Sequence, residues 1–216
     1  MSATDLRSRS RFLGPARREA GKSPGDKPLW EPSQARIVGA NVTAFARAAI
    51  REWGLKFNTY AEFYQWSVDQ PEQFWQSLWQ YAEVKASTRG RRVLLHGRKM
   101  PGAQWFPDAR LNFAENLLRR RDRADAVIFW GEDKVERRLS HAQLYAEVWR
   151  LAQALRAAGV QTGDRIVGYL PNLPETVMAM LASASIGAIW SSCSPDFGVQ
   201  GVLDRFGQIE PKVLFA

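Results

Sequence analysis

The sequence has few of the residues from which disulfides and metal centres are built. Cys193 is the only cysteine among 216 residues, so an intrachain disulfide is excluded and a cysteine-based zinc site is not expected. The two histidines, His96 and His141, have no cysteine, carboxylate or second histidine at metal-ligand spacing. We therefore expect neither a disulfide-stabilised secreted domain nor a metal centre, and the cysteine content favours a cytoplasmic protein.

Long apolar segments are also absent. The longest apolar stretch, 166–190, is broken by Pro171, Asn172, Pro174 and Glu175, so it lacks the roughly 20 consecutive apolar residues that span a bilayer. The first 21 residues lack the apolar segment of a secretory signal. These absences predict a soluble protein with no membrane partner.

Several catalytic signatures are missing as well. The sequence contains no G-x-S-x-G elbow, no H-E-x-x-H zinc motif and no G-x-x-x-x-G-K-[ST] phosphate loop. Gly198, Gly201 and Gly207 do not form the G-x-G-x-x-G pattern of dinucleotide-binding folds. Cys193 ends a predicted buried strand with no histidine near it in sequence, which is typical of an inert core thiol. No catalytic residue is assigned from the sequence alone.

The net charge of +8 comes from the N-terminal part of the chain. It is +5 over residues 1–50, +3 over 51–100, +1 over 101–150 and −1 over 151–216. Turn-forming residues crowd the segment 14–32, so residues 1–31 are predicted to form a basic, flexible tail. A solvated tail and a tail that binds nucleic acid or an anionic surface both fit this pattern.

The next region, 32–118, is rich in aromatic residues and has helical spacing. Asn41 is placed to cap a helix that stops at Gly54, and the segment 59–62 has the spacing of a capping box. Pro71 starts a third helix, which carries a stripe at i, i+3, i+4 spacing made of Phe74, Trp75, Leu78, Trp79 and Ala82. The stripe predicts core packing, with a partner-binding groove as the alternative.

From about residue 125 the pattern alternates between strands and helices. Predicted strands cover 126–130, 135–139, 165–170, 188–192 and 212–216, with helices after the second, third and fourth of them. The fold class is therefore α/β: a helical N-terminal extension followed by the start of a doubly wound, mainly parallel sheet. Because the last strand would leave a bare sheet edge, we expect an incomplete domain and hence an N-terminal fragment.

One strand-to-helix turn, residues 191–198, stands where open parallel sheets bind ligands, outside the carboxyl end of a strand. Ser194 and Pro195 are placed as a helix cap and first-turn pair, and Asp196 adds a carboxylate. Gly198 would allow close approach of a ligand to the backbone. A helix start that binds nothing has the same pattern, so both interpretations stay open.

Three segments resemble a known enzyme family. Residues 105–118 resemble the N-terminal signature of acetyl-CoA-synthetase-like enzymes, and residues 163–175, GDRIVGYLPNLPE, resemble the first core motif of the adenylate-forming superfamily. Residues 190–198, WSSCSPDFG, are similar to the acetoacetate–CoA ligases and not to the acetate ligases, which have a glycine-rich turn there. The resemblance runs from about Pro32 to Ala216.

This resemblance implies a ligase that joins acetoacetate to CoA through an acyl adenylate, with ATP, CoA and Mg²⁺ as cofactors. In the family, the phosphate-binding loop, the ribose and magnesium residues and the catalytic lysine would follow residue 216, so the fragment alone is expected to be inactive. The implied domains are a tail (1–31), an aromatic helical region (32–118) and the first part of an AMP-binding domain (119–216). The implied border of the CoA channel is formed by Ser194, Asp196, Phe197 and Gly198.

Two other functions remain open. A related short-chain acyl-CoA synthetase could take another acid, because the family's acid-selecting residues are expected after residue 216. A basic, Trp-rich module could bind RNA or an anionic surface, since aromatic side chains beside arginines can stack on bases.

Overall fold

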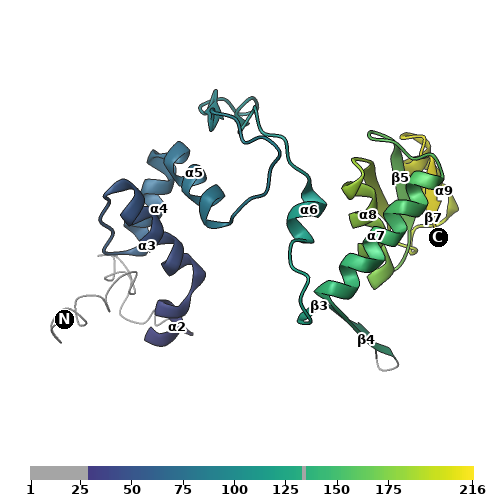
Figure 1. Cartoon of the computed structure of the whole chain (residues 1–216), viewed down its shortest axis with the longest axis horizontal. Helices are drawn as coiled ribbons and strands as arrows, with labels where there is room; N and C mark the ends of the chain where they lie inside the picture. The colour runs from purple at the N-terminus through teal and green to yellow at the C-terminus, as the bar shows by residue number, and fades with distance from the viewer. Residues whose placement is uncertain (1–28, 133–134) are drawn as a thin grey trace. The chain divides into compact units, whose positions relative to one another are not determined.

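The computed structural model describes residues 29–132 and 135–216, so most of the tail predicted over 1–31 lies outside the described residues. The chain divides into two compact units (Figure 1). Unit 1 runs to Val84 and includes Gly90–Ala109, whereas unit 2 contains Lys85–Arg89 and Arg110–Ala216. In the described part of the chain, no helix is long and apolar enough to cross a membrane.

Unit 1 contains the three predicted helices and a shorter one before them. They are α2 (Gln34–Gly39), α3 (Asn41–Trp53), α4 (Tyr60–Asp69) and α5 (Pro71–Tyr81). The predicted role of Asn41 as a helix cap is wrong. Because α2 ends at Gly39, Ala40 alone is extended between the two helices, so Asn41 already lies in the first turn of α3. The predicted stop at Gly54 is confirmed, with φ of 65° in the left-handed region that glycine tolerates.

The N-terminus of α4 forms half of the predicted capping box. Thr59 Oγ1 accepts a hydrogen bond from Glu62 N at 3.2 Å, as expected. The carboxylate of Glu62 accepts a hydrogen bond from Asn58 N, one residue before the cap, at 2.5 Å. The helix start is therefore stabilised from both sides, although the second bond reaches a different residue.

Aromatic side chains form the core of unit 1. Phe45, Phe57, Phe63 and Trp66 are buried, and their rings approach edge-on or tilted, with centroids 5.8 Å apart for Phe45 and Phe63. The apolar stripe of α5 is shared between two neighbours. Phe74 and Leu78 pack against this core, whereas Trp75 and Trp79 contact Trp105 and Phe106, with centroids 5.3 and 4.6 Å apart. The predicted core packing is thus confirmed for two of the five stripe residues.

The second half of unit 1 is a long loop with a small antiparallel pair, β1 (Leu94–Leu95) and β2 (Gln104–Trp105). The two arms of the loop are joined by Arg92, which donates from both Nε and Nη2 to the carboxylate of Asp108. These hydrogen bonds from Arg92 lower the pKa of Asp108 to about 2. Asp108 also lies directly against Gly90 at the base of the loop.

We predict that this link weakens in acid. Since the pKa of Asp108 is lowered on folding, the stabilisation is complete above its ordinary value of 3.8 and is lost as the pH falls towards about 2. The variant Asp108→Asn should be less stable than the parent at pH 7, and this difference should become much smaller as the pH falls to 2. Urea unfolding across this range measures both differences, and a constant difference would contradict the assignment.

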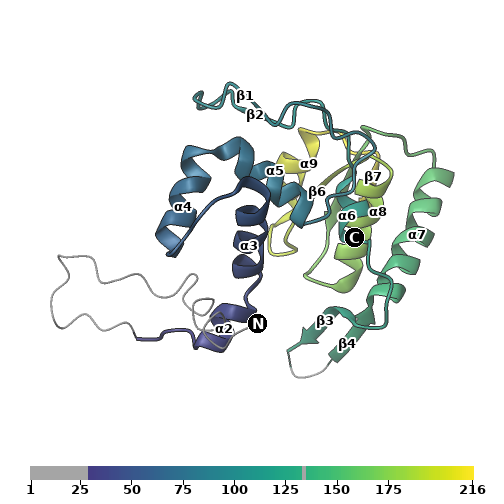
Figure 2. The ribbon, with the colours of Figure 1, turned by 60° about the vertical axis from the view of Figure 1, so that its left-hand side comes forward.

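Unit 2 follows the alternating pattern predicted from the sequence. Its elements are α6 (Phe113–Leu117), β3 (Asp125–Gly131), β4 (Val135–Ser140), α7 (His141–Ala157), β5 (Arg165–Tyr169), α8 (Pro174–Ser185), β6 (Ile189–Cys193), α9 (Val199–Gly207) and β7 (Val213–Phe215). β3 and β4 form an antiparallel hairpin that projects from the N-terminal end of α7 (Figure 2). β6, β5 and β7 form a parallel sheet in that order.

Local signals explain where α7 begins and ends. Ser140 and Gln143 form a capping box, with each side chain bonded to the other residue's backbone N–H. Leu144, Val148, Ala152 and Leu155 are buried on one face of the helix, and Gly159 turns the chain with φ of 81°.

The central strand β5 is covered on both faces. Ile166 is fully buried in the cluster that contains the apolar faces of α7 and α8. Its neighbour Val167, also fully buried, lies in the cluster with Cys193 and Phe206 of α9. Because successive side chains of a strand point to opposite faces, α8 and α9 cover opposite sides of the sheet. This arrangement confirms the predicted doubly wound α/β pattern.

The strand has room for no side chain at Gly168. A Cβ atom at this position would lie 2.7 Å from two ring atoms of Trp190 on the adjacent strand. We predict that Gly168→Ala lowers the free energy of unfolding by about 1–3 kcal/mol, the usual cost of overpacking. A matched control is Gly207→Ala at the end of α9, where nothing lies within 4 Å. Denaturant unfolding of both variants tests this, and equal stabilities would contradict it.

Candidate functional site

The candidate turn follows β6. At this point two neighbouring parallel strands, β5 and β6, continue into helices that lie on opposite faces of the sheet. β5 continues into α8, and β6 continues into α9 on the other side of the sheet. Tyr169 and Cys193 end the two strands side by side, since they are register partners. In open α/β sheets, a crevice outside the carboxyl ends of such strands is the usual place for a ligand. The loop 170–173 and the turn 194–198 flank this position.

The turn is closed by its own polar groups. Phe197 N donates to the carbonyl of Ser194 at 3.1 Å, and Ser194 Oγ donates to the carboxylate of Asp196 at 2.8 Å. The predicted role of Ser194 as a helix cap is wrong. Because these bonds form a tight turn first, α9 begins only at Val199, and Gly198 is its N-cap in extended conformation. A Cβ at Gly198 would meet no atom within 4 Å, so the backbone there is open to a ligand.

Tyr169 attaches the turn to the central strand. Its hydroxyl lies 2.9 Å from the carbonyl oxygen of Pro195 and 3.0 Å from that of Phe197, and donates to this pair of acceptors. The tyrosine ring packs beside the buried cluster of Val167 and Cys193. The position of the turn is therefore set by a residue of the sheet and not by the turn alone.

The opposite side of the turn is formed by α9. The guanidinium of Arg205 lies 3.9 Å from the ring centroid of Phe197, and its Nη1 donates to the carbonyl of Gly201 at 3.0 Å. Val199 is 78% exposed at the start of the helix, which leaves an apolar side chain beside Gly198 in solvent. The structure thus brings together all four predicted site residues in one turn.

Two side chains at the turn carry groups with chemical reactivity, the thiol of Cys193 and the hydroxyl of Ser194. Cys193 is buried beneath the turn, as predicted for a core thiol. Ser194 hydrogen-bonds with Asp196 and has no histidine among its described partners. Within residues 29–132 and 135–216, no group of three or more His, Cys, Asp or Glu is placed to hold a metal ion.

Comparisons with known proteins show which families this chain is similar to. Residues 60–117 match the acetyl-coenzyme A synthetase N-terminus family, and residues 113–216 match the AMP-binding enzyme family. An acetoacetyl-coenzyme A synthetase of Rhizobium meliloti (strain 1021) is 50% identical over 188 residues, and one of Danio rerio is 41% identical over 193. The chain is homologous to the acetoacetyl-CoA synthetases. The resemblance inferred from its motifs is therefore confirmed.

A solved structure supports the same relationship. The acetoacetyl-CoA synthetase from Streptomyces lividans is 44% identical and superposes with a TM-score of 0.81 over 88% of this chain. The chain spans about 30% of the length of that structure and 29% of the Rhizobium protein. The fold class predicted from the sequence agrees with this neighbour.

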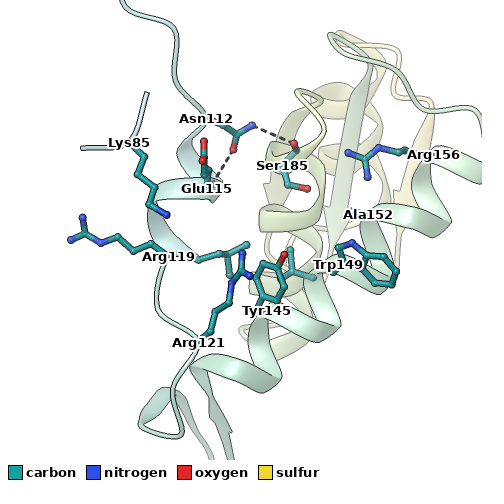
Figure 3. Close-up of a pocket in the computed structure, with 12 residues that line it drawn as sticks. Lys85, Asn112, Glu115, Arg119, Arg121, Tyr145, Trp149, Ala152, Arg156 and Ser185 are labelled. Carbon is teal, nitrogen blue, oxygen red and sulfur yellow. Dashed lines mark hydrogen bonds between the residues drawn. The ribbon is translucent and has the colours of Figure 1, made fainter. Parts of the chain in front are cut away.

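Unit 2 also contains a hollow that was not found from the sequence. This groove, here the α6–α7 groove, has a volume of about 390 Å³ and is lined by residues that include Lys85, Leu118, Arg121, Tyr145, Val148, Trp149, Ala152 and Arg156 (Figure 3). Tyr145, Trp149, Ala152 and Arg156 are spaced so that they share one face of α7. That spacing is a signal in the sequence, although it does not reveal that Lys85 lies opposite.

We predict that the Tyr169 hydroxyl holds the turn closed. In Tyr169→Phe, loss of this hydrogen bond should cost about 1 kcal/mol locally, which corresponds to roughly five-fold faster amide exchange at residues 196–198. Tyr64→Phe is the control, because the Tyr64 hydroxyl is exposed and has no hydrogen-bond partner among the described residues. Hydrogen exchange measured by mass spectrometry tests this, and unchanged exchange in Tyr169→Phe would contradict it.

Proposed function

We propose that the full-length protein carrying this chain is an acid–thiol ligase that converts acetoacetate, ATP and CoA into acetoacetyl-CoA, AMP and pyrophosphate. The observation that carries the proposal is the 40–50% identity, over 87–88% of the chain, to acetoacetyl-CoA synthetases from a bacterium and several vertebrates. The TM-score of 0.81 with the Streptomyces enzyme supports it.

The chemistry explains why such an enzyme uses two steps. A carboxylate is a poor electrophile because its charge is delocalised, so it first attacks the α-phosphate of ATP and displaces pyrophosphate. The thiol of CoA then attacks the carbonyl carbon of the acyl adenylate and displaces AMP. Both steps need preorganised positive charge around the phosphoryl group. In the family, the residues that supply it are expected after residue 216, and Mg²⁺ bound to the phosphates supplies further charge.

The part of this chain that we assign to the reaction is the turn after β6. Ser194, Asp196, Phe197 and Gly198 are proposed to border the channel through which CoA reaches the adenylate. Their position at the carboxyl ends of β5 and β6 supports this role, as does the open backbone at Gly198. Tyr169 is a positioning residue, since its hydroxyl holds the carbonyls of the turn.

The domain limits and the location also remain proposals. We place the aromatic helical region at 32–118 and the AMP-binding domain from residue 119. The family matches at 60–117 and 113–216 support a limit near residue 118, whereas the compact units change at Lys85–Arg89 and Arg110. A cytoplasmic location agrees with the single buried cysteine.

A related reaction with another acid is the second candidate. The malonamoyl-CoA synthetase vrtB of Penicillium aethiopicum is 37% identical over 206 residues of the alignment. Its name describes an acid that carries an amide where acetoacetate carries a methyl ketone. The homology of this N-terminal segment therefore supports the ligase chemistry more strongly than the choice of acid.

The full-length protein should release pyrophosphate when ATP and acetoacetate are supplied together, and should form a thioester once CoA is added. Among acetate, acetoacetate, malonamate and butyrate, acetoacetate should give the highest kcat/KM. Coupled pyrophosphate detection and thioester mass spectrometry measure the two steps.

The isolated 216-residue chain is the matched control and should form no acyl adenylate. A higher kcat/KM for malonamate than for acetoacetate would overturn the proposed acid and support the ligase chemistry. Absence of pyrophosphate release with every acid would overturn the proposed function.

A further inference from the structure

The α6–α7 groove is a formed hollow that the proposed reaction does not use. Its floor consists of apolar side chains, with Leu118, Val148 and Ala152 all buried. At about 390 Å³ its volume lies in the range of small-molecule sites, roughly 300–1,000 Å³. All its lining residues belong to unit 2, and it lies beside α7 and α6, away from the turn at the carboxyl edge of the sheet.

Two asparagines hold the walls of the groove in place. Asn112 caps α6 by accepting from Glu115 N at 3.1 Å, and its Nδ2 donates to the carbonyl of Ala184 in α8 at 2.8 Å. Asn116 accepts from Lys85 N and donates to Lys85 O, both at 2.9 Å. Because these bonds fix α6 and the segment at Lys85, the groove exists before any ligand binds.

Basic side chains line the groove on both sides. Lys85 and Arg156 extend from opposite sides of the hollow (Figure 3), and neither side chain makes a hydrogen bond or ion pair with a described residue. Five other basic side chains of the unit pair with carboxylates, whereas Arg165 and Arg205 donate to backbone carbonyls; the five pairs are Arg120 with Asp122, Arg137 with Glu175, Arg138 with Asp125, Arg150 with Glu147 and Lys212 with Asp164. The groove therefore has positive charge with few carboxylates to balance it; Glu115 is one lining carboxylate.

Aromatic rings stand beside this charge. The guanidinium of Arg121 lies 3.8 Å from the ring centroid of Tyr145, a stacked cation–π pair that holds the arginine at the groove. Trp149, one helical turn further along α7, is 55% exposed next to the apolar floor. An exposed indole beside a hollow can cover a flat ring, which removes apolar surface of both partners from water.

We propose that the α6–α7 groove binds a nucleoside phosphate. Lys85, Arg121 and Arg156 would contact the phosphate, because ionised phosphate oxygens form charge-assisted hydrogen bonds with ammonium and guanidinium groups. The base would lie on Trp149 over the floor of Val148 and Ala152. An inorganic anion would use the cations but leave the aromatic surface exposed, so the base is part of the assignment. The proposal does not depend on the ligase activity.

Calorimetric titration of the full-length protein with three probes tests this site. Guanosine 5′-monophosphate is the main probe, because it is not the nucleotide of the proposed reaction, and inorganic phosphate and guanosine are its two parts. The monophosphate should bind more tightly than either part. The double variant Lys85→Gln/Arg156→Gln should weaken its binding about ten-fold or more. Trp149→Leu should weaken binding of the monophosphate and leave binding of inorganic phosphate unchanged.

The control variant is Arg150→Gln. It removes one positive charge from the same helix, but Arg150 pairs with Glu147 and does not line the groove. It should bind like the parent. Hydrogen exchange locates the bound monophosphate. It should slow amide exchange in α7 within 141–157 and leave the exchange rates of residues 196–198 unchanged.

Four outcomes would overturn the assignment. They are no binding of the monophosphate, equal affinity for monophosphate and phosphate, an equal loss in Arg150→Gln, and protection confined to residues 196–198. If an acidic protein segment occupied the groove, the monophosphate would not bind, which is the first of these outcomes.

Discussion

The double burial of β5 is the constraint on which the rest of unit 2 depends. Ile166 and Val167 are both fully buried, and they point to opposite faces of the sheet. A strand with two buried faces needs cover on both sides, which α7 and α8 provide on one and α9 on the other. The chain must therefore pass over each face in turn, and neighbouring strands send their loops in opposite directions.

That constraint also positions the candidate site. Tyr169 follows the buried pair in the same strand, so the residue that holds the turn after β6 is itself held by the core. The close approach of Gly168 to Trp190 sets β5 and β6 tightly together. The turn of Ser194–Gly198 is thus rigidly attached at its base and open at Gly198, which suits a surface past which a substrate moves.

Unit 1 is stabilised in a different way. Its core consists of aromatic rings on short helices in edge-on and tilted contact, with Trp66 buried among Phe45, Phe57 and Phe63. Trp53 donates its indole N–H to Ser77 at 2.7 Å, and Ser77 donates to Glu52 at 2.7 Å, so polar partners accompany the buried aromatics. Trp53 and Trp66 are thus committed to packing, whereas Trp30, Trp75 and Trp105 of the same unit are exposed.

The sequence by itself determined the longer helices and strands, the α/β class and the resemblance to the acetoacetyl-CoA synthetases, because helix caps, turn glycines and apolar periodicity are local, and the motifs at 105–118, 163–175 and 190–198 are contiguous. It misplaced two caps, at Asn41 and Ser194, since each depends on how the preceding segment turns. Only the tertiary structure decided that Tyr169 reaches Pro195 and that Lys85 lies opposite Arg156. Such pairs are 26 and 71 positions apart in the chain, and no local pattern specifies which distant side chains a packed core brings together.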